Sequence, residues 1–204
     1  MTTPVIIGIT GKMRSGKSTL ANVLAYNNNS TVLSFAQYVR KEVAEAFFGH
    51  TTDPHAHLMA QEAADKGTIR PILQAFGHGK RVLISKDYWV EQLSKDVRKN
   101  FSDKKVIFID DVRYPNEVEY IIKNGGFIVR LVCDTQTLLR RGASEAALEH
   151  PSENALDPDN LTIAESMLPH HTLALDSSLS DQEALQRWTT DWLLNNQVEI
   201  KKVE

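Results

Sequence analysis

The stretch VIIGITGKMRSGKST, residues 5–19, decides the fold of this chain. Its first five residues, Val5 to Ile9, are apolar and mostly β-branched, as is typical of a strand buried on both faces. Residues 11–18 match the pattern G-x-x-x-x-G-K-[ST], and apolar residues at helical spacing follow up to Tyr26. A buried strand, a glycine-containing loop and a helix in this order predict a loop that binds phosphate groups. A plain glycine turn that binds nothing is the alternative.

Each fixed position of this loop has a chemical reason. Gly11 and Gly16 let the backbone curl, so that successive N–H groups point into one hollow and hold phosphate oxygens. The Lys17 ammonium can reach the β- and γ-phosphates of a nucleotide, and the Ser18 hydroxyl can bind Mg2+. We therefore expect ATP and Mg2+ as ligands, with the nucleotide bound by Gly11, Lys12, Met13, Arg14, Ser15, Gly16, Lys17, Ser18 and Thr19.

Strands and helices alternate through the rest of the chain. Short apolar runs predict further strands at residues 31–35, 106–109, 127–132 and 171–176. Helical spacing predicts helices at residues 18–26, 38–48, 70–76, 87–97, 115–123 and 180–195. Residues 125 and 126, both glycine, should end the helix 115–123. This alternation predicts a three-layer α/β fold around a parallel sheet.

The spacing of the strands also predicts how the chain is organised. We expect one domain over residues 1–204, because its length suits a single core. The second and third strands are too far apart for a simple crossover, which predicts a helical insertion over residues 36–104. A polar segment follows the fourth strand, and we interpret residues 140–160 as a lid. The core is then assigned to residues 1–35, 105–139 and 161–204.

Composition excludes several classes of protein. The formal net charge of -3 argues against a basic coat for a nucleic acid polymer. The single cysteine, Cys133, excludes an internal disulfide framework and fits a reducing compartment. There is no apolar run long enough for a membrane span and no signal-peptide pattern. We therefore expect a cytoplasmic protein without a membrane partner.

Two carboxylates, Asp110 and Asp111, follow the apolar run 106–109. In a protein with a phosphate-binding loop, a carboxylate at this position faces the magnesium ion. We favour Asp111 for this role, so that Ser18 and Asp111 form the metal site, and we keep Asp110 as the alternative. An ordinary strand exit or a helix cap is the alternative to any metal role.

Phosphoryl transfer needs alignment and positive charge more than it needs a nucleophile. We therefore expect arginines from several segments to act together. The predicted catalytic residues are Lys17, Asp111, Arg113, Arg140 and Arg141. Arginines expected to bind a phosphate-bearing acceptor are Arg40, Arg70, Arg81 and Arg113. For any one of them, a solvated surface ion pair is the alternative. Trp89 is either a core residue or a wall for a base.

Several motifs occur in an order that resembles a known family. They are the loop at residues 8–19, the segment Ser34 to Ala36, the block RPILQAFG at residues 70–77, the box DDVRYPNE at residues 110–117, and HPSE at residues 150–153. The chain resembles the deoxynucleoside monophosphate kinases of bacteriophages, within the P-loop nucleoside-monophosphate kinase group. The resemblance spans about residues 5–185, and the box at residues 110–117 is its most selective part.

The resemblance implies a five-stranded parallel core, an insertion that binds the acceptor and a lid that carries arginines. It implies transfer of the γ-phosphoryl group from ATP to a (deoxy)nucleoside monophosphate. The acceptor site would comprise Phe35, Arg40, Arg70, Gln74, Arg81, Trp89 and Arg113. Many relatives are dimers, which leaves a homodimer open.

Two other functions stay open from the sequence. One is a P-loop kinase for another small acceptor, such as a sugar acid or dephospho-coenzyme A. Such an acceptor is an alcohol and needs a base, a role that Asp110 or Asp111 could take. The other is a nucleotide-dependent switch ATPase, against which the long insertion and the absence of an Asn-Lys-x-Asp box both argue.

Overall fold

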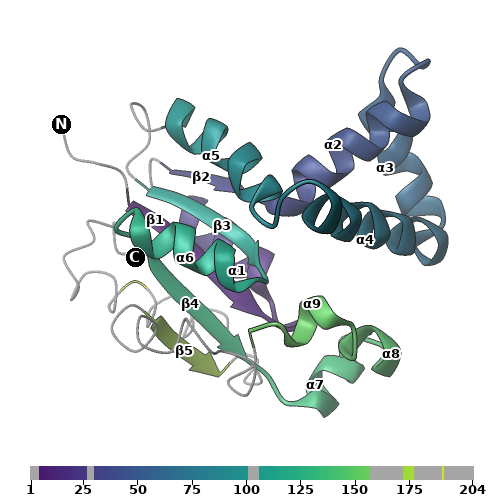
Figure 1. The fold of residues 1–204 in the computed structure, drawn as a ribbon. Helices are drawn as coiled ribbons and strands as arrows, with labels where there is room; N and C mark the ends of the chain where they lie inside the picture. The colour runs from purple at the N-terminus through teal and green to yellow at the C-terminus, as the bar shows by residue number, and fades with distance from the viewer. Residues whose placement is uncertain (1–4, 27–29, 101–105, 157–171, 177–189, 191–204) are drawn as a thin grey trace. The chain divides into compact units, whose positions relative to one another are not determined.

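The computed structural model describes residues 5–26, 30–100, 106–156, 172–176 and 190 (Figure 1). The chain divides into two compact units, and each is described by itself. The core unit comprises Met1–Leu33 together with Val97–Glu204, and the helical unit comprises Ser34–Asp96. The sequence places the insertion at residues 36–104. The predicted helix 180–195 lies outside the described residues.

A parallel sheet forms the centre of the core unit. Its strands are β1 (Val5–Gly11), β2 (Ser30–Leu33), β3 (Val106–Val112) and β4 (Phe127–Val132), with β5 (Thr172–Asp176) paired to β4 at the edge. The spatial order is β2-β3-β1-β4-β5, and every neighbouring pair is parallel. In the register of the sheet, Ile7 lies opposite Phe108 on one side and Phe127 on the other. The predicted α/β class with a parallel sheet is confirmed.

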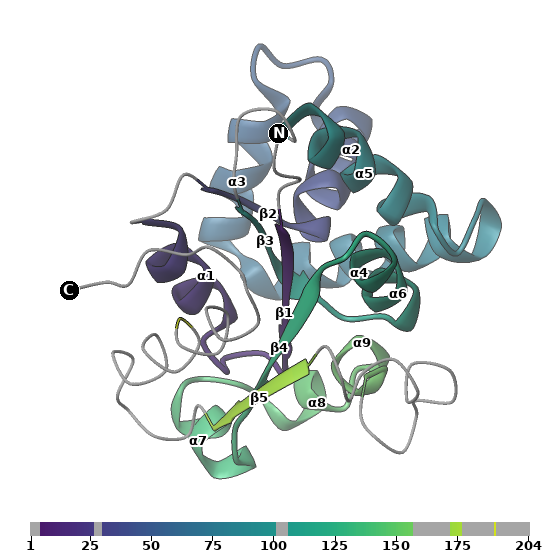
Figure 2. The ribbon, with the colours of Figure 1, turned by 90° about the vertical axis from the view of Figure 1, so that its left-hand side faces the viewer.

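Helices cover both faces of this sheet. Figure 2 shows α1 (Lys17–Tyr26) on one side of the strands and α6 (Pro115–Lys123) on the other. Side chains alternate between the faces of a strand, so every second residue of a strand can pack on the same helix. A cluster of buried residues joins α1 to the sheet: Ile7, Ile9, Leu20, Ala21, Leu24, Val106, Phe108, Val129 and Leu131. Unbroken apolar runs produce this double burial, as the sequence predicts.

The carboxyl ends of β1 and β3 bring the predicted donor-site residues together. These two strands are neighbours and run parallel, so the loop after β1 and the carboxylates at the end of β3 lie at the same edge. Open α/β sheets bind ligands outside the carboxyl ends of their strands, where the strand order reverses. After β1, the chain first forms β2 and β3 on one side of β1 and then forms β4 and β5 on its other side. The strand order therefore reverses at β1.

Three short helices follow β4 in the core unit. They are α7 (Thr135–Arg140), α8 (Glu145–Leu148) and α9 (Pro151–Asn154). The last two lie in the segment that the sequence predicts as a lid, residues 140–160, and we call its described part, residues 140–156, the lid segment. The Arg130 guanidinium of β4 donates a hydrogen bond of 2.8 Å to the Leu156 carbonyl, which ties down the end of this segment.

The helical unit is built from α2 (Phe35–Phe48), α3 (Pro54–Ala64), α4 (Lys66–Leu83) and the start of α5 (Tyr88–Asn100). Its core consists of Val43, Ala44 and Leu58, with partly buried Val39, Phe48, Ile69, Ile72, Leu73 and Phe76 packed on them. None of the helices in the described residues combines the length and the apolar character that a membrane span requires.

Two sequence predictions in this unit need correction. The predicted strand 31–35 ends at Leu33, because Ser34 adopts an extended N-cap conformation and Phe35 begins α2. Helix α3 was not predicted, because Leu58 is its one buried residue and its apolar periodicity is therefore weak. Its start is set by Asp53, whose carboxylate accepts the Ala56 N–H at 2.9 Å, and by Pro54 in the first turn.

Candidate nucleotide-binding site

The backbone after β1 has the curled conformation that an anion-binding loop requires. The φ angles of Gly11, Arg14 and Gly16 are 143°, 64° and 95°, all in the region that favours glycine. At Gly11 a side chain would also collide, because a Cβ atom would lie 2.6 Å from the Leu131 carbonyl oxygen. A bond of 3.2 Å from the Ser15 N–H to the Lys12 carbonyl closes the turn. This alternation of backbone conformations directs successive amides into a common concavity.

Lys17 lies buried at the start of α1, against this loop. Its ammonium donates hydrogen bonds of 2.8 Å to the carbonyls of Gly11 and Lys12. A lysine ammonium has three donors, so one remains for a ligand. Burial, followed by the positive charge of Arg113, lowers the pKa of Lys17 to about 8, against the opposing effect of nearby carboxylates. An arriving phosphate would favour the charged form of this lysine.

Of the two carboxylates at the end of β3, Asp110 contacts the hydroxyl of Ser18, which follows the phosphate loop. It shares a side-chain hydrogen bond with Ser18, while burial, as the larger effect, raises its pKa. Asp111 also lies close enough to raise the pKa of Lys17. The contact with Ser18 favours Asp110 over our expected Asp111 as the carboxylate beside a metal ion.

A hydroxyl and a carboxylate fit the ligand chemistry of Mg2+, which takes few protein oxygens and fills its shell with waters and phosphates. Ser18 and Asp110 would hold that ion, with Asp111 close by. Within the described ranges, no group of three or more His, Cys, Asp and Glu side chains could hold a metal ion alone. A site that depends on the nucleotide for its remaining ligands is consistent with this arrangement.

Arg113 is held in place from both of its ends. At its backbone, the N–H donates a bond of 2.7 Å to the carboxylate of Glu117, which also accepts the Tyr114 N–H at 3.1 Å. Glu117 is buried in the first turn of α6, where the helix dipole favours a negative charge. At its side chain, Arg113 forms an ion pair with Glu153 of α9. Arg113 was predicted from the sequence as a site residue, whereas Glu117 and Glu153 were not.

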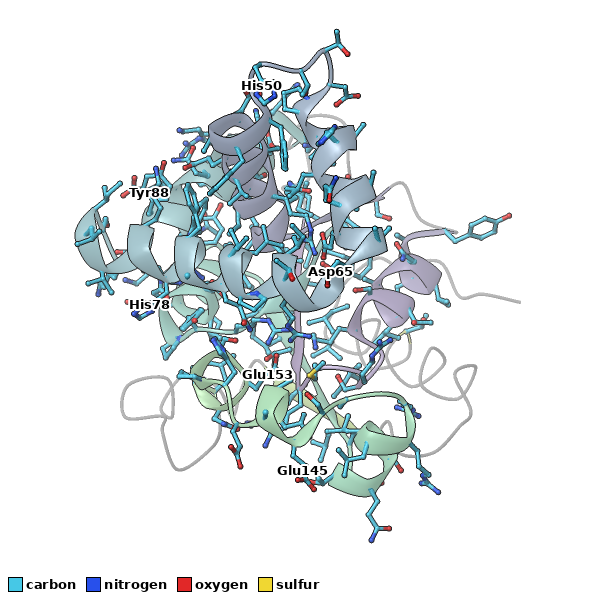
Figure 3. The ribbon with its side chains drawn as sticks, turned by 90° about the vertical axis from the view of Figure 1, so that its right-hand side faces the viewer. His50, Asp65, His78, Tyr88, Glu145 and Glu153 are labelled. Atoms are coloured by element: carbon cyan, nitrogen blue, oxygen red, sulfur yellow. The ribbon has the colours of Figure 1, made fainter. Side chains whose placement is uncertain are left out.

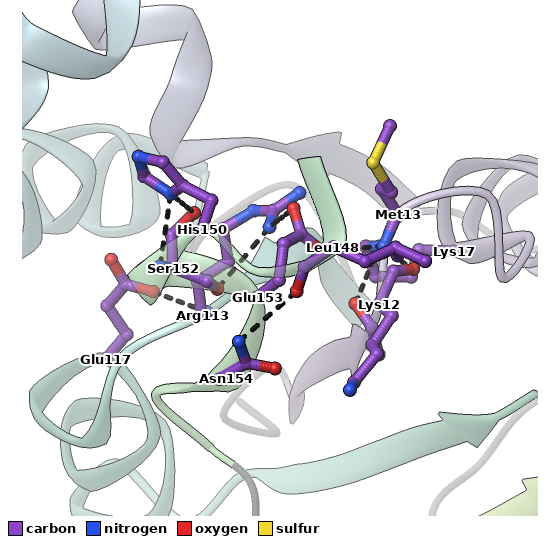
Figure 4. A network of polar contacts seen from close by, with 11 residues as sticks. Lys12, Met13, Lys17, Arg113, Glu117, Leu148, His150, Ser152, Glu153 and Asn154 are labelled. Atoms are coloured by element: carbon purple, nitrogen blue, oxygen red, sulfur yellow. Dashed lines mark hydrogen bonds and ion pairs between the residues drawn. The ribbon is translucent and has the colours of Figure 1, made fainter. Parts of the chain in front are cut away.

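Glu153 connects the lid segment to the loop itself. One carboxylate oxygen pairs with Arg113, and the other accepts the Met13 N–H at 2.6 Å (Figure 4). Its side chain is completely buried. The sequence offered one signal for this residue, the HPSE motif at residues 150–153, but no pattern assigned the carboxylate a partner.

The two predicted lid arginines differ in what they contact. The Arg140 guanidinium donates a bond of 2.7 Å to the Thr137 hydroxyl in its own helix. The Arg141 guanidinium donates to the Arg14 carbonyl of the loop at 3.5 Å, a longer contact. Of the two, Arg141 therefore lies closer to the phosphate-binding backbone. The sequence could not separate these neighbours.

The predicted acceptor residues lie in the helical unit, apart from Arg113. Arg70, Gln74 and Arg81 are spaced by four and seven residues along α4, which places them on one face of that helix. All three are partly buried. Such a face offers two guanidinium groups and one amide, the chemistry that recognises a phosphate and a polar base.

The other predicted acceptor residues have roles inside the helical unit. Arg40 forms a bidentate ion pair with Glu62, with bonds of 2.9 and 3.0 Å. Trp89 is buried, and its indole N–H donates a bond of 2.9 Å to the Gly77 carbonyl of α4. Phe35 is buried in the first turn of α2. Of the two alternatives for Trp89, this geometry favours the core residue.

A comparison with family models gives the class to which this fold and site belong. Residues 7–153 match the model described as an AAA domain, and the chain belongs to that family. The matched range includes the phosphate loop, the helical unit and the lid segment up to Glu153. A search of curated proteins found no match.

Several solved structures described as kinases share the fold over nearly the whole chain. A putative kinase from Chloroflexus aurantiacus has a TM-score of 0.53 and 19% identity, covering 96% of this chain and 98% of its own. A sugar kinase from Janibacter sp. has a TM-score of 0.55 and 14% identity, covering 94% and 95%. A gluconokinase from Sinorhizobium meliloti has a TM-score of 0.50 and 13% identity, covering 98% and 100%. At this identity the likeness is one of fold, the kinase-like P-loop fold.

Proposed function

We propose that this protein transfers the γ-phosphoryl group of ATP to a (deoxy)nucleoside monophosphate and releases two nucleoside diphosphates. The observation that carries the proposal is the buried Lys17, bonded to two loop carbonyls and surrounded by Asp110, Asp111 and Arg113. This arrangement supplies the positive charge and the metal-side carboxylates that in-line phosphoryl transfer requires. A cytoplasmic location and a homodimer stay predictions from the sequence.

The residues of the core unit would each have a distinct task. The loop amides and Lys17 bind the phosphate chain, and Ser18 with Asp110 holds Mg2+, which neutralises charge on the β- and γ-phosphates. Arg113 and one lid arginine stabilise the charge that spreads over the transferred group. A phosphate acceptor is already anionic, so none of these residues needs to act as a general base.

The α4 face supports an acceptor that carries both a phosphate and a base. We assign Arg70 and Arg81 to the acceptor phosphate or its neighbourhood, and Gln74 to a polar edge of the base. Two guanidiniums on one helix suit an anionic acceptor better than a neutral one. Arg40 stays a weaker candidate, because the Glu62 carboxylate already accepts hydrogen bonds from the Nε and Nη2 atoms of its guanidinium.

A second candidate function is phosphorylation of another small acceptor, such as a sugar acid. Two of the structures that share the fold are a sugar kinase and a gluconokinase, which favours this alternative. An alcohol acceptor would need a base, and the raised pKa of Asp110 suits a carboxylate that takes up a proton. The carboxylate of a sugar acid could also pair with a guanidinium of the α4 face, so the choice between the two candidates rests on the acceptor assay.

A panel of acceptors tests the proposal. Purified protein is assayed with ATP and Mg2+ against the four deoxynucleoside monophosphates, the four ribonucleoside monophosphates, gluconate and dephospho-coenzyme A, with ADP formation coupled to NADH oxidation. We expect turnover with at least one monophosphate well above the rate without acceptor. Turnover with gluconate or dephospho-coenzyme A alone supports the second candidate, and slow hydrolysis unchanged by every acceptor contradicts both.

A further inference from the structure

The carboxylate of Glu153 lies among groups that a phosphate would use. It accepts the Met13 N–H at 2.6 Å and pairs with the guanidinium of Arg113 (Figure 4). Among the negative groups that raise the pKa of Lys17, Glu153 has the largest effect, ahead of Asp111 and Asp110. The carboxylate is thus held by a loop amide and a guanidinium, and it lies close enough to the Lys17 ammonium to raise the pKa of that group.

The local sequence holds this carboxylate in place. His150 caps the short helix α9, where its Nδ1 atom accepts the Ser152 N–H at 3.2 Å and its carbonyl accepts the Glu153 N–H at 2.8 Å. The Asn154 amide donates a bond of 3.2 Å back to the Leu148 carbonyl. Figure 3 shows the result: Glu145 of α8 points outward, whereas Glu153 points inward. The inward direction of Glu153 is therefore built into the lid segment.

The position of Met13 indicates which phosphate is concerned. The amides next to the start of α1 cradle the α- and β-phosphates, and the lysine of the loop reaches the β- and γ-phosphates. Met13 lies three residues before Gly16, on the side of the loop away from the helix start. Its amide, together with Arg113 and Lys17, is thus left for the terminal phosphate of the nucleotide.

We propose that Glu153 occupies the position of the terminal phosphate of a nucleoside triphosphate when no nucleotide is bound, and that a triphosphate must displace it. A carboxylate and a γ-phosphate cannot share these donors, because two anions at contact distance repel each other strongly in a buried site. The inference rests on the proposed function only in taking ATP as the donor.

This exchange has a thermodynamic consequence. If the loop accepts a triphosphate only when Glu153 has left, the apparent affinity for ATP is reduced by the fraction of molecules in that state. A diphosphate, which lacks the terminal group, meets no such competition. Glu153 thereby ties the movement of the lid segment to the presence of the phosphoryl group that is to be transferred.

Titration calorimetry with ATP and with ADP, each with Mg2+, tests the proposal on E153Q. The variant keeps the size of the side chain and removes the charge. We expect ATP to bind about tenfold more tightly than to the wild type, with ADP affinity changed less than about twofold. The matched control is E145Q, an exposed glutamate of the same segment, for which we expect both affinities to stay at wild-type values. Unchanged or weaker ATP binding to E153Q, or an equal gain for ADP, overturns the proposal.

Two further measurements keep the result decisive. If wild-type protein fails to bind ATP at all, the proposed function fails, whereas ATP binding that E153Q leaves unchanged defeats only the present inference. If E153Q does not fold, hydrogen exchange of wild-type peptides from residues 144–156 replaces it. We expect ATP, but not ADP, to speed their exchange by releasing Glu153. Exchange that ATP slows or leaves unchanged contradicts the proposal.

Discussion

The phosphate loop and the α4 face are two candidate ligand sites that would bind through different groups, the loop through backbone amides and the α4 face through side chains. The loop binds through its backbone, and its shape follows from glycines, a turn and a helix start that are fixed by residues 11–18. The α4 face would bind only through the side chains Arg70, Gln74 and Arg81. The comparison teaches that a short sequence motif is enough to predict a site formed by the backbone. A site formed by side chains is harder to predict, because the position of each side chain depends on residues elsewhere in the chain.

Loss of Lys17 should have the largest effect on activity of the substitutions considered. We expect Lys17→Ala to lower turnover by about 1,000-fold, because it removes the charge that stabilises the transferred group. The steady-state rate with the best acceptor measures this. Lys12→Ala, a change in the same loop, should cost less than about tenfold, because no chemistry is assigned to its ammonium. Equal losses in the two variants would show that the loop, not Lys17, carries the effect.

The two carboxylates of β3 can be ranked in the same way. We expect Asp110→Asn to lower turnover by about 100-fold and to raise the Mg2+ concentration needed for half-maximal rate, because Asp110 bonds Ser18. Asp111→Asn should cost about tenfold, because it removes an electrostatic effect on Lys17 and leaves the contact between Asp110 and Ser18 in place. Magnesium titrations of both variants measure this difference. The reverse order would restore Asp111 as the metal-side residue.

The α4 face should affect the acceptor and leave the donor unchanged. We expect Arg81→Ala to raise KM for the monophosphate by about tenfold with KM for ATP unchanged, since one charge-assisted contact is lost. Lys41→Ala, which removes an exposed charge from α2 of the same unit, serves as control and should leave both values within about twofold. A rise in KM for ATP instead would assign Arg81 to the donor.

The lowered pKa of Lys17 should make ATP affinity depend on pH, and we expect this effect to be smaller than those of the substitutions. Because the pKa of Lys17 is lowered to about 8, its charge is lost as the pH rises through that value in the nucleotide-free protein. Phosphate binding favours the charged form, so ATP affinity should be constant below pH 8 and fall above it, by up to about tenfold per pH unit. Calorimetry in buffers of different ionisation enthalpy should show proton uptake above pH 8. Affinity that rises with pH would contradict the assignment of Lys17.

The sequence predicted the core unit well because its signals are local. Apolar runs gave β1, β3 and β4, and the two glycines after α6 ended that helix, with Gly125 at a φ of 74°. Predictions failed where the determinant was distant or weakly periodic. Helix α3 buries only Leu58, so its apolar periodicity is weak, and α4 extends beyond the predicted residues 70–76 at both ends, across Gly67, Gly77 and Gly79.

The candidate site shows the same division. The loop residues were predicted from spacing alone, but the contact between Glu153 and Met13 joins residues 140 positions apart. The choice between Asp110 and Asp111 likewise depends on which carboxylate meets Ser18, and no local pattern determines that. Side-chain partners across the fold therefore carried the information that the sequence lacked.

The most direct test of the account follows the γ-phosphoryl group itself. Wild-type protein and Lys17→Ala are incubated with ATP labelled in that group, Mg2+ and an equimolar mixture of the four deoxynucleoside monophosphates, and the products are separated. The account predicts label in at least one deoxynucleoside diphosphate with the wild type and almost none with Lys17→Ala. Label found only in inorganic phosphate, at the same rate with and without monophosphates, would contradict it.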